Sequence, residues 1–387
     1  MIVTVPARLQ CFFQRCAPDL TPAGCAMLAW IVAAYLLVTG KRSQSAIGRE
    51  VLDRQRHVSS VSRRLRRPCF RTRDLTRAEM LREVAEELKR AGGRKETWFL
   101  IIDGVCLRRG RLTKIQNAVV YKKNRKKRGR GAVTKAHTFV LGLLVTPTGR
   151  RIPLPRRSFY THGYVRTRNK ELAAGERQGL RLAYKSQIDL ACLIVEELDL
   201  PTHLRLVVLA DEYFDSRKLT DTCRTKGATL ITPVNSLRSF DGGGRVHQRG
   251  KALSRRTYRD LVLCRGGEET ASYRRREPSG TGRKKDERVY RLFVEPRTLA
   301  TTGRVAVVYS WKKRRDRSGR QTGKETFKVL VCSDPTLAGE TIVEYYEMRW
   351  EIEVFFREWV KAHSGSAPQQ AHAHPPPVAP RVRQAKE

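Results

Sequence analysis

The chain has 387 residues, and its 78 lysines and arginines outnumber its 38 aspartates and glutamates, which gives a formal net charge of +40. Hydrophobic residues make up 40% of the chain, which is typical of a globular protein of two or three domains and excludes a disordered basic tail. A charge of this size indicates a large polyanion as partner, and nucleic acid is the first candidate. An arginine-rich genome is the alternative source of the charge, but it does not readily explain clusters such as Lys122 to Arg130.

The nine cysteines argue against a secreted protein built on disulfides. Their number is odd, they are scattered, and no CxxC pair occurs. We also expect no zinc site, because Cys11 and Cys16 lack a matching downstream cluster of cysteines and histidines. Reduced thiols are the simplest interpretation.

An apolar segment from Cys25 to Val38 precedes the rest of the helical N-terminal region. It is shorter than the roughly 20 residues that a membrane-spanning helix needs, so it predicts a buried helix. A membrane-attached protein is an alternative that rests on this segment alone.

Residues 1–94 are expected to form a helical DNA-binding region. Two short helices are predicted at Ser43 to Leu52 and His57 to Pro68, and the second carries Arg63 and Arg64. The pattern fits a helix-turn-helix and fits an ordinary helical hairpin with solvated arginines equally well. A third helix is predicted from Leu75 to Ala91.

From Thr97 the pattern changes to short apolar runs of the kind that form buried strands. The first run, TWFLIIDG, is expected to stop at Asp103, and a later one, Leu204 to Phe214, contains Asp211. Between these two runs the sequence predicts two strands and then a helix. After the second run it predicts a further helix and a further strand, so that all these elements together make a mixed α/β sheet. These elements lie at His137 to Pro147, Arg150 to Pro155, Gln187 to Leu198, 215–227 and 228–234.

Residues 236–326 predict a β-rich insertion with basic loops. Strand-like pieces occur at Tyr258 to Cys264, Arg288 to Val294 and Arg304 to Trp311. Phe327 to Ser333 then returns to the core, and a long helix is predicted from about Leu337 to Ala362. The remaining residues, 363–387, are rich in proline, alanine and histidine and are expected to be disordered.

The two aspartates are the first candidates for chemistry. A carboxylate at the end of a buried strand is held rigidly at the edge of the sheet, and Mg²⁺ is usually held by one or two such oxygen ligands. Either aspartate alone is better explained as a strand-end cap or turn former, but the occurrence of both favours a site.

The last predicted helix supplies a third acidic group. At about 100° per residue, Tyr346, Arg349 and Glu353 lie on one face, whereas Glu351 points elsewhere and is the weaker ligand candidate. An amphipathic helix with an exposed Arg349–Glu353 ion pair is the alternative interpretation.

These landmarks together resemble the insertion-sequence DDE transposases. The subclass is the one with a β-rich insertion and a Y-R-E-K helix motif, and the resemblance covers roughly residues 95–361. It implies a ribonuclease H-like mixed sheet with helices on both faces. It further implies two Mg²⁺ or Mn²⁺ ions held by Asp103, Asp211 and Glu353, which cut double-stranded DNA at the element ends and join it to a target. A homodimer in the bacterial cytoplasm, associated with DNA and not with a membrane, is also implied.

The resemblance and the basic clusters together predict the residues that bind DNA. Arg349 and Tyr346 would bind phosphate near the site, and Trp350 or Trp311 would be candidates to stack on an unpaired base. The predicted DNA-binding set is Tyr346, Arg349, Arg357, Lys361, Lys122, Lys123, Arg125, Lys126, Lys127, Arg63 and Arg64.

Two departures from the family pattern are visible. The motif lysine is expected seven residues after the glutamate, where this chain has Val360, with Lys361 next to it and Arg357 as a possible substitute. The family usually continues into further helices, whereas this chain runs into its proline-rich tail, which predicts a truncated copy. A decayed, inactive DNA-binding protein and a stand-alone ribonuclease H-like nuclease therefore stay open as alternatives.

Overall fold

The structure is a computed structural model, and it describes part of the chain. The described residues are 7–16, 21–37, 72–92, 96–108, 119–122, 133–174, 182–265, 273–275, 287–313 and 325–356. Both predicted helices of the possible helix-turn-helix and the predicted disordered tail lie outside these ranges.

The strands of the described residues range in length from two to thirteen residues. They are β1 (Thr97–Arg108), β2 (Val119–Lys122), β3 (Val133–Val145), β4 (Arg151–Pro153), β5 (Arg157–Ser158), β6 (Arg205–Ala210), β7 (Thr229–Pro233), β8 (Arg259–Arg265), β9 (Tyr273–Arg275), β10 (Glu287–Leu299), β11 (Gly303–Lys313) and β12 (Thr326–Cys332).

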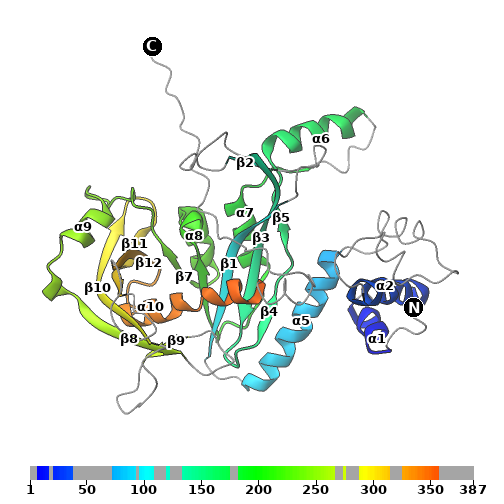
Figure 1. Ribbon diagram of the computed structural model, residues 1–387, viewed down its shortest axis with the longest axis horizontal. Helices are drawn as coiled ribbons and strands as arrows, with labels where there is room; N and C mark the ends of the chain where they lie inside the picture. The colour runs from blue at the N-terminus through cyan, green and yellow to red at the C-terminus, as the bar shows by residue number, and fades with distance from the viewer. Residues whose placement is uncertain are drawn as a thin grey trace.

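These strands form one mixed sheet, shown in Figure 1. Its order is β2-β3-β1-β6-β7-β12-β11-β10-β8-β9, with β4 and β5 also paired to β3. The pairs β1–β6 and β6–β7 are parallel, and the other pairs are antiparallel. The predicted strands of the insertion are present, and they continue the core sheet through the pairing of β11 with β12.

The helices lie on both faces of this sheet and beside it. They are α1 (Ala7–Cys16), α2 (Pro22–Leu37), α5 (Thr72–Ala91), α6 (His162–Ala174), α7 (Gln187–Glu197), α8 (Arg217–Thr225), α9 (Val246–Ala252) and α10 (Gly339–Glu347). Short 3₁₀ turns occur at η2 (Glu212–Phe214) and η3 (Arg255–Thr257), and residues 350–356 are again helical.

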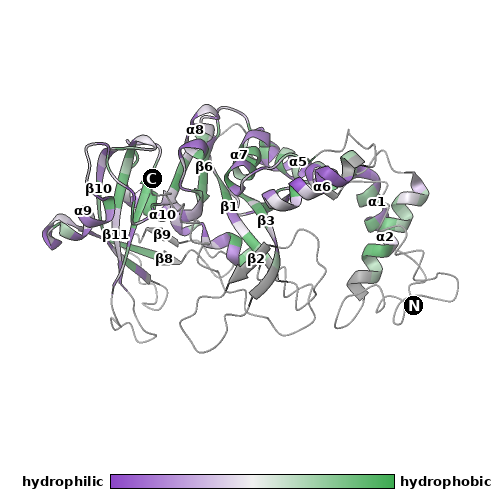
Figure 2. Ribbon diagram, turned by 90° about the horizontal axis from the view of Figure 1, so that it is seen from above, coloured by the Kyte–Doolittle hydropathy of each residue, from purple (hydrophilic) through white to green (hydrophobic). Residues whose placement is uncertain are grey.

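Alternation along the central strands builds two cores. In β1, Leu100 and Ile102 face α5, α7 and α8, whereas Ile101 faces α10. Successive side chains of a strand point to opposite faces, so an almost wholly apolar strand buries both. The apolar character of the central strands, against the polar character of α6, is visible in Figure 2. The fold is therefore the predicted ribonuclease H-like α/β sheet with helices on both faces.

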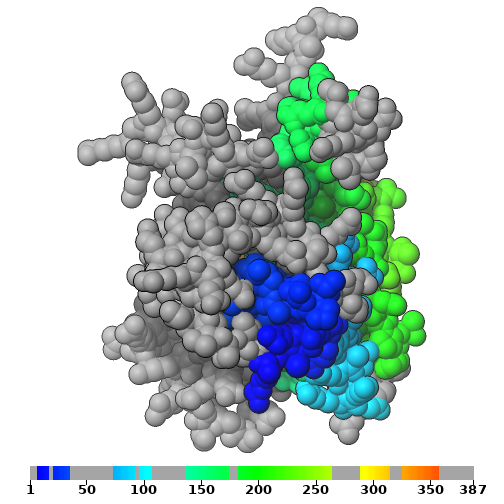
Figure 3. All heavy atoms as spheres, turned by 90° about the vertical axis from the view of Figure 1, so that its right-hand side faces the viewer, coloured from blue at the N-terminus to red at the C-terminus, as the bar shows by residue number. Residues whose placement is uncertain are grey.

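The N-terminal helices pack beside the sheet. Figure 3 shows α1 and α2 next to α5, and their contact is built on Phe13, Cys25, Leu28 and Ala29. The apolar α2 is a buried helix, as its sequence predicts, with Ala29 and Ala34 fully covered. Among the described residues, no helix has the length and apolar character needed to cross a bilayer.

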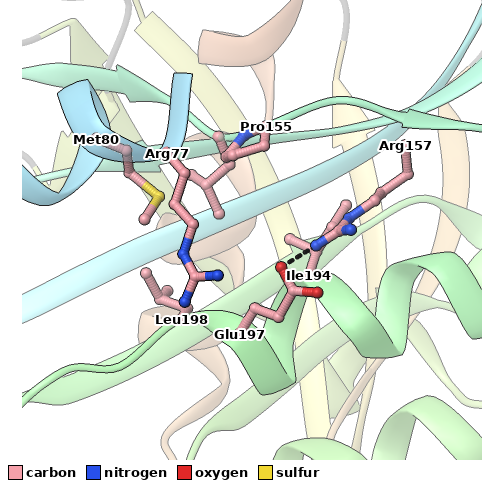
Figure 4. A pocket seen from close by; sticks show the side chains of 8 residues that line it. Arg77, Met80, Pro155, Arg157, Ile194, Glu197 and Leu198 are labelled. Atoms are coloured by element: carbon pink, nitrogen blue, oxygen red, sulfur yellow. Dashed lines mark hydrogen bonds and ion pairs between the residues drawn. The ribbon is translucent and has the colours of Figure 1, made fainter. Parts of the chain in front are cut away.

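A shallow crevice marks where α5 meets the core. Figure 4 shows Arg157 of β5 reaching Glu197 of α7, and Glu197 also accepts hydrogen bonds from Arg73 of α5 at 2.8 Å. Its lining is Arg77, Met80, Leu154, Pro155, Arg157, Ile194, Glu197 and Leu198. The crevice contains none of the candidate catalytic carboxylates, and its charged groups tie the N-terminal region to the sheet.

Two elements differ from the sequence-based expectation. Strand β1 does not stop at Asp103 but continues to Arg108, because β3 pairs with it from Phe99 to Arg108. The long final helix is interrupted by a turn at residues 348–349. In addition, α6 is present although the sequence did not predict it, and Figure 1 shows it extending away from the sheet.

Candidate active site

Asp103 and Asp211 occupy equivalent positions on two neighbouring parallel strands. The parallel pairing of β1 with β6 ends at Ile102 opposite Ala210, and each aspartate is the next residue along the chain. Parallel strands carry their carboxyl ends at the same edge of a sheet, so the two side chains share one edge. The sequence predicts this arrangement, because each apolar run is followed by an aspartate, even though β1 continues beyond Asp103.

Asp103 lies in a cluster of charges. Its Oδ1 accepts a hydrogen bond from the Gly104 N–H at 2.8 Å, and its Oδ2 lies 4.0 Å from Nη1 of Arg349. Burial raises the pKa of Asp103 to about 7, and the charges of Asp211 and Glu353 act in the same direction. Arg349 and the Gly104 N–H oppose that rise. Asp103 therefore binds a proton near neutrality unless a cation joins it.

Asp211 is fixed by its own backbone and by β7. It caps η2, where its Oδ1 accepts a hydrogen bond from the Tyr213 N–H at 3.0 Å. Its carbonyl oxygen accepts a hydrogen bond from the Thr232 hydroxyl at 2.9 Å. Burial raises the pKa of Asp211, while the Tyr213 N–H and the positive charges of Arg349 and Lys328 oppose the rise. The carboxylate is thus oriented and weakly solvated.

The turn at residues 348–349 presents Arg349 to the carboxylates. The N–H groups of Met348 and Arg349 each donate to a carbonyl three residues back, at 3.0 Å, which tightens the helix into a turn. Nη2 of Arg349 donates to Oε1 of Glu353 at 2.8 Å, and its Cζ lies 5.9 Å from the ring centre of Tyr346. Burial lowers the pKa of Arg349, but the surrounding Tyr346, Asp103 and Glu353 outweigh it and the net shift is upward. Arg349 therefore links Glu353 to Asp103.

The other acids of the same segment are paired elsewhere. Glu351 is 2% exposed and contacts Nη2 of Arg151 on β4 at 2.7 Å. Glu347 accepts a hydrogen bond from the Tyr290 hydroxyl and pairs with Arg288 and with Lys312, the latter at 3.5 Å. These contacts fasten the segment to strands on both sides and leave Glu353 facing the aspartates through Arg349.

Lys328 of β12 is a group at this site that sequence reasoning missed. Its Nζ lies 5.0 Å from the ring centre of Tyr346, and Asp211, Glu212 and Glu353 all act on its charge. The available signal was weak, namely a single lysine inside the apolar run FKVLVCS.

The remaining predicted DNA-binding residues are not placed at the site. Lys122 ends β2, and the other members lie outside the described residues: Lys123, Arg125, Lys126, Lys127, Arg63, Arg64, Arg357 and Lys361. Of the two tryptophans, Trp311 packs on Phe327 with ring centres 4.6 Å apart, and Trp350 is 38% exposed.

The donor chemistry of the site suits a hard divalent cation. Asp103 and Asp211 offer carboxylate oxygens, and the charge of Asp211 raises the pKa of Asp103. A cation between the two carboxylates would offset this repulsion. Within the described ranges, however, no three acidic, histidine or cysteine side chains converge into a ready metal cluster. Arg349 lies between Asp103 and Glu353 and serves as their counter-ion in this arrangement.

The comparison with known families bears directly on this geometry. Residues 178–365 match the family model described as the transposase DDE domain. This stretch is therefore similar to the transposase DDE domain. Members of this family typically bind DNA and use divalent metal ions. No curated protein matches the chain.

The matched stretch includes Asp211 and Glu353 but begins after Asp103. The sheet supplies the link, because β1 carries Asp103 and pairs directly with β6 inside the matched stretch.

Proposed function

We propose that this chain is a DNA transposase that makes metal-dependent cuts in phosphodiester bonds at the ends of an insertion sequence and transfers the freed strand. The observation that carries the proposal is the placement of Asp103 and Asp211 directly after the last paired residues of the neighbouring parallel strands β1 and β6, with Glu353 joined to Asp103 through Arg349. The transposase DDE domain match supports it.

Asp103, Asp211 and Glu353 would hold two divalent ions, which are Mg²⁺ or Mn²⁺. Such a pair supplies activation of the attacking oxygen and stabilisation of the leaving oxygen on the phosphate. For Glu353 to serve as a ligand, its carboxylate must exchange the 2.8 Å hydrogen bond to Arg349 for the cation. Arg349 is then released to face a phosphate.

The side chains contribute charge and orientation. Arg349 is fully protonated and sits between two carboxylates, so its guanidinium is placed to form charge-assisted hydrogen bonds to phosphate oxygens. Tyr346 is 7% exposed and supports Arg349 with its ring. Asp103 must lose its proton before it can act as a ligand, because burial raises its pKa to about 7.

The proposal extends to the organisation of the chain. Residues 1–94 and the basic cluster from Lys122 to Arg130 would bind DNA, and residues 95–235 with 327–362 would form the catalytic core. The insertion, 236–326, would extend the sheet beside the site, and the complete enzyme would act as a homodimer. The net charge of +40 supports binding to the phosphate backbone.

A second candidate is an inactive transposase-derived protein that still binds DNA. The observation that favours it is the Arg349–Glu353 hydrogen bond, which closes the third carboxylate off in the described arrangement.

A plasmid-nicking assay separates the two candidates without knowledge of the element ends. Supercoiled plasmid is incubated with wild type, Asp103→Asn, Asp211→Asn and Glu353→Gln in Mg²⁺, in Mn²⁺ and in chelator. We expect nicking only with metal, and a loss of at least about 100-fold in each variant, as is common when a group that acts on the transition state is removed.

The matched control is Asp221→Asn, which removes a carboxylate that pairs with arginines on α8, away from the site. It should nick like wild type, and all variants should keep their affinity for a labelled duplex. Nicking that persists in Asp103→Asn would remove Asp103 from the site. A wild-type protein that binds DNA but nicks with neither metal would establish the second candidate.

A further inference from the structure

Strand topology brings Lys328 to the edge that carries the catalytic aspartates. Strand β12 runs antiparallel to β7, with Leu330 opposite Pro233, the last residue of β7. The beginning of β12 therefore lies at the edge where β6 and β7 end, beside Asp211. Lys328 and Leu330 point to the same face of the sheet, and that is the face that α10 covers.

The surroundings of Lys328 are those of a cation held in place but not neutralised. Its Nζ lies 5.0 Å from the ring centre of Tyr346, a distance at which the ring attracts a cation. The residue is exposed, yet enough protein surrounds it to lower the pKa of its amine, an effect of burial that the positive charge of Arg349 reinforces. The acidic groups Glu212, Glu353 and Asp211 oppose that shift.

Cations near Lys328 have acidic partners, whereas Lys328 has none among the described residues. Lys312 contacts Glu347 and Lys313 contacts Asp260, each at 3.5 Å. Arg349 is hydrogen-bonded to Glu353. Within the part of the chain that the structure describes, Lys328 forms no ion pair. Its charge is thus available to a group that enters from outside.

We propose that Lys328 binds a phosphate of the DNA strand that is cut, next to the scissile phosphate, with its stem supported by Tyr346. A lysine ammonium is a compact point charge that binds phosphate well, and an exposed position beside the carboxylates lets the backbone of the strand reach it. The inference rests on the proposed function for the identity of the strand, and it adds a substrate-binding residue from β12.

Chemical protection tests the contact directly. Pyridoxal 5′-phosphate combines a phosphate with an aldehyde, which condenses with a lysine amine to an imine and releases water, and borohydride then fixes the adduct. Mass spectrometry locates modified lysines with and without a duplex of about 20 base pairs, which is long enough to span several phosphate contacts. We expect the duplex to protect Lys328 and to leave Lys226 unprotected. Lys226 is an exposed residue that follows α8 and precedes the start of β7, at the opposite edge of the sheet.

Binding of the same duplex, measured by fluorescence anisotropy, gives the second readout. Lys328→Gln should weaken binding about tenfold and lower the slope of log affinity against log salt by about 0.9, as expected for one lost phosphate contact. Lys328→Arg should bind within about threefold of wild type, because it keeps the charge. Lys226→Gln removes the same charge and should change neither quantity.

Equal modification of Lys328 with and without DNA, or equal affinities for Lys328→Gln and Lys226→Gln, would overturn the inference. The thermal midpoint of each variant checks that it is folded. If Lys328 is protected but the wild-type protein nicks no plasmid, the phosphate contact stands and the proposed function fails.

Discussion

The raised pKa of Asp103 predicts an unusual pH dependence of stability, which Asp103→Asn should remove. Asparagine has nearly the same shape and keeps an oxygen for the Gly104 N–H, but it carries no charge. In the folded chain the Asp103 carboxyl titrates at about 7, against a usual value of 3.8. A difference of this size corresponds to up to about 4 kcal/mol between the two protonation states.

The sign follows from which state binds more protons. Between about pH 4 and pH 7 the folded state keeps a proton on Asp103 that the unfolded state has lost. The free energy of unfolding therefore falls as the pH rises through this range and stays level above it. The Asn variant lacks this loss, so near pH 8 and without metal it should be more stable than wild type by as much as about 4 kcal/mol. Near pH 4 the two proteins should be alike.

Urea unfolding followed by circular dichroism, at about pH 5 and about pH 8 in chelator, measures this difference. Asp189→Asn is a control of opposite sign. The hydrogen bond from Lys218 lowers the pKa of Asp189 to about 2, so that carboxylate stabilises the fold above about pH 4 and its loss should destabilise at neutral pH. Added Mg²⁺ should raise the stability of wild type at pH 8 more than that of Asp103→Asn. An Asn variant that is less stable than wild type at pH 8 would refute the reasoning.

Three further predictions concern other parts of the chain. Glu347→Gln should lower the thermal midpoint and slow plasmid nicking about tenfold. Glu347 contacts Tyr290, Arg288 and Lys312, and these contacts hold the turn that presents Arg349 to the carboxylates. A variant that nicks as fast as wild type would contradict this. Gly250→Ala should cost about 2 kcal/mol in urea unfolding, since its Cβ would lie 2.2 Å from Cδ1 of Tyr309, whereas Gly163→Ala, with open space around it, should be neutral or stabilising. DNA affinity should fall on the order of 1,000-fold between about 50 and 200 mM salt, and a shallow slope would attribute the +40 charge to codon usage.

The sequence predicts those parts of the fold that depend on local pattern. The apolar runs that became β1, β6 and β7 bury both of their faces, and Ser186 with Asp189 forms a capping box that starts α7 where the sequence predicts a helix. The insertion strands β8, β10 and β11 also lie where the sequence has strand-like pieces. The helix α6 was missed because its sequence carries little apolar periodicity and Val165 is its one buried residue among those described.

The site depends more on long-range pairing, which a single sequence does not reveal. Nothing near Asp103 indicates that β3 will extend β1 beyond it, since the partner residues lie 28 to 36 positions later. The break at residues 348–349 replaces an expected continuous helix, yet Arg349 in the turn still meets Glu353 in the helix that resumes at residue 350. The place of Lys328 beside Tyr346 follows from the antiparallel pairing of β12 with β7, far apart in the chain.

The position of β1 in the middle of the sheet has a consequence for how the chain can be divided. The stretch that matches the transposase domain starts at residue 178, after β1 and β3. A fragment cut there would leave β6 with one bare side, because the row of N–H and C=O groups that β1 satisfies from Thr97 to Ile102 would have no partner. Such an open, apolar strand edge recruits other chains, so we expect the fragment to aggregate. The stretch that matches the family model is therefore not expected to fold into a stable sheet without β1.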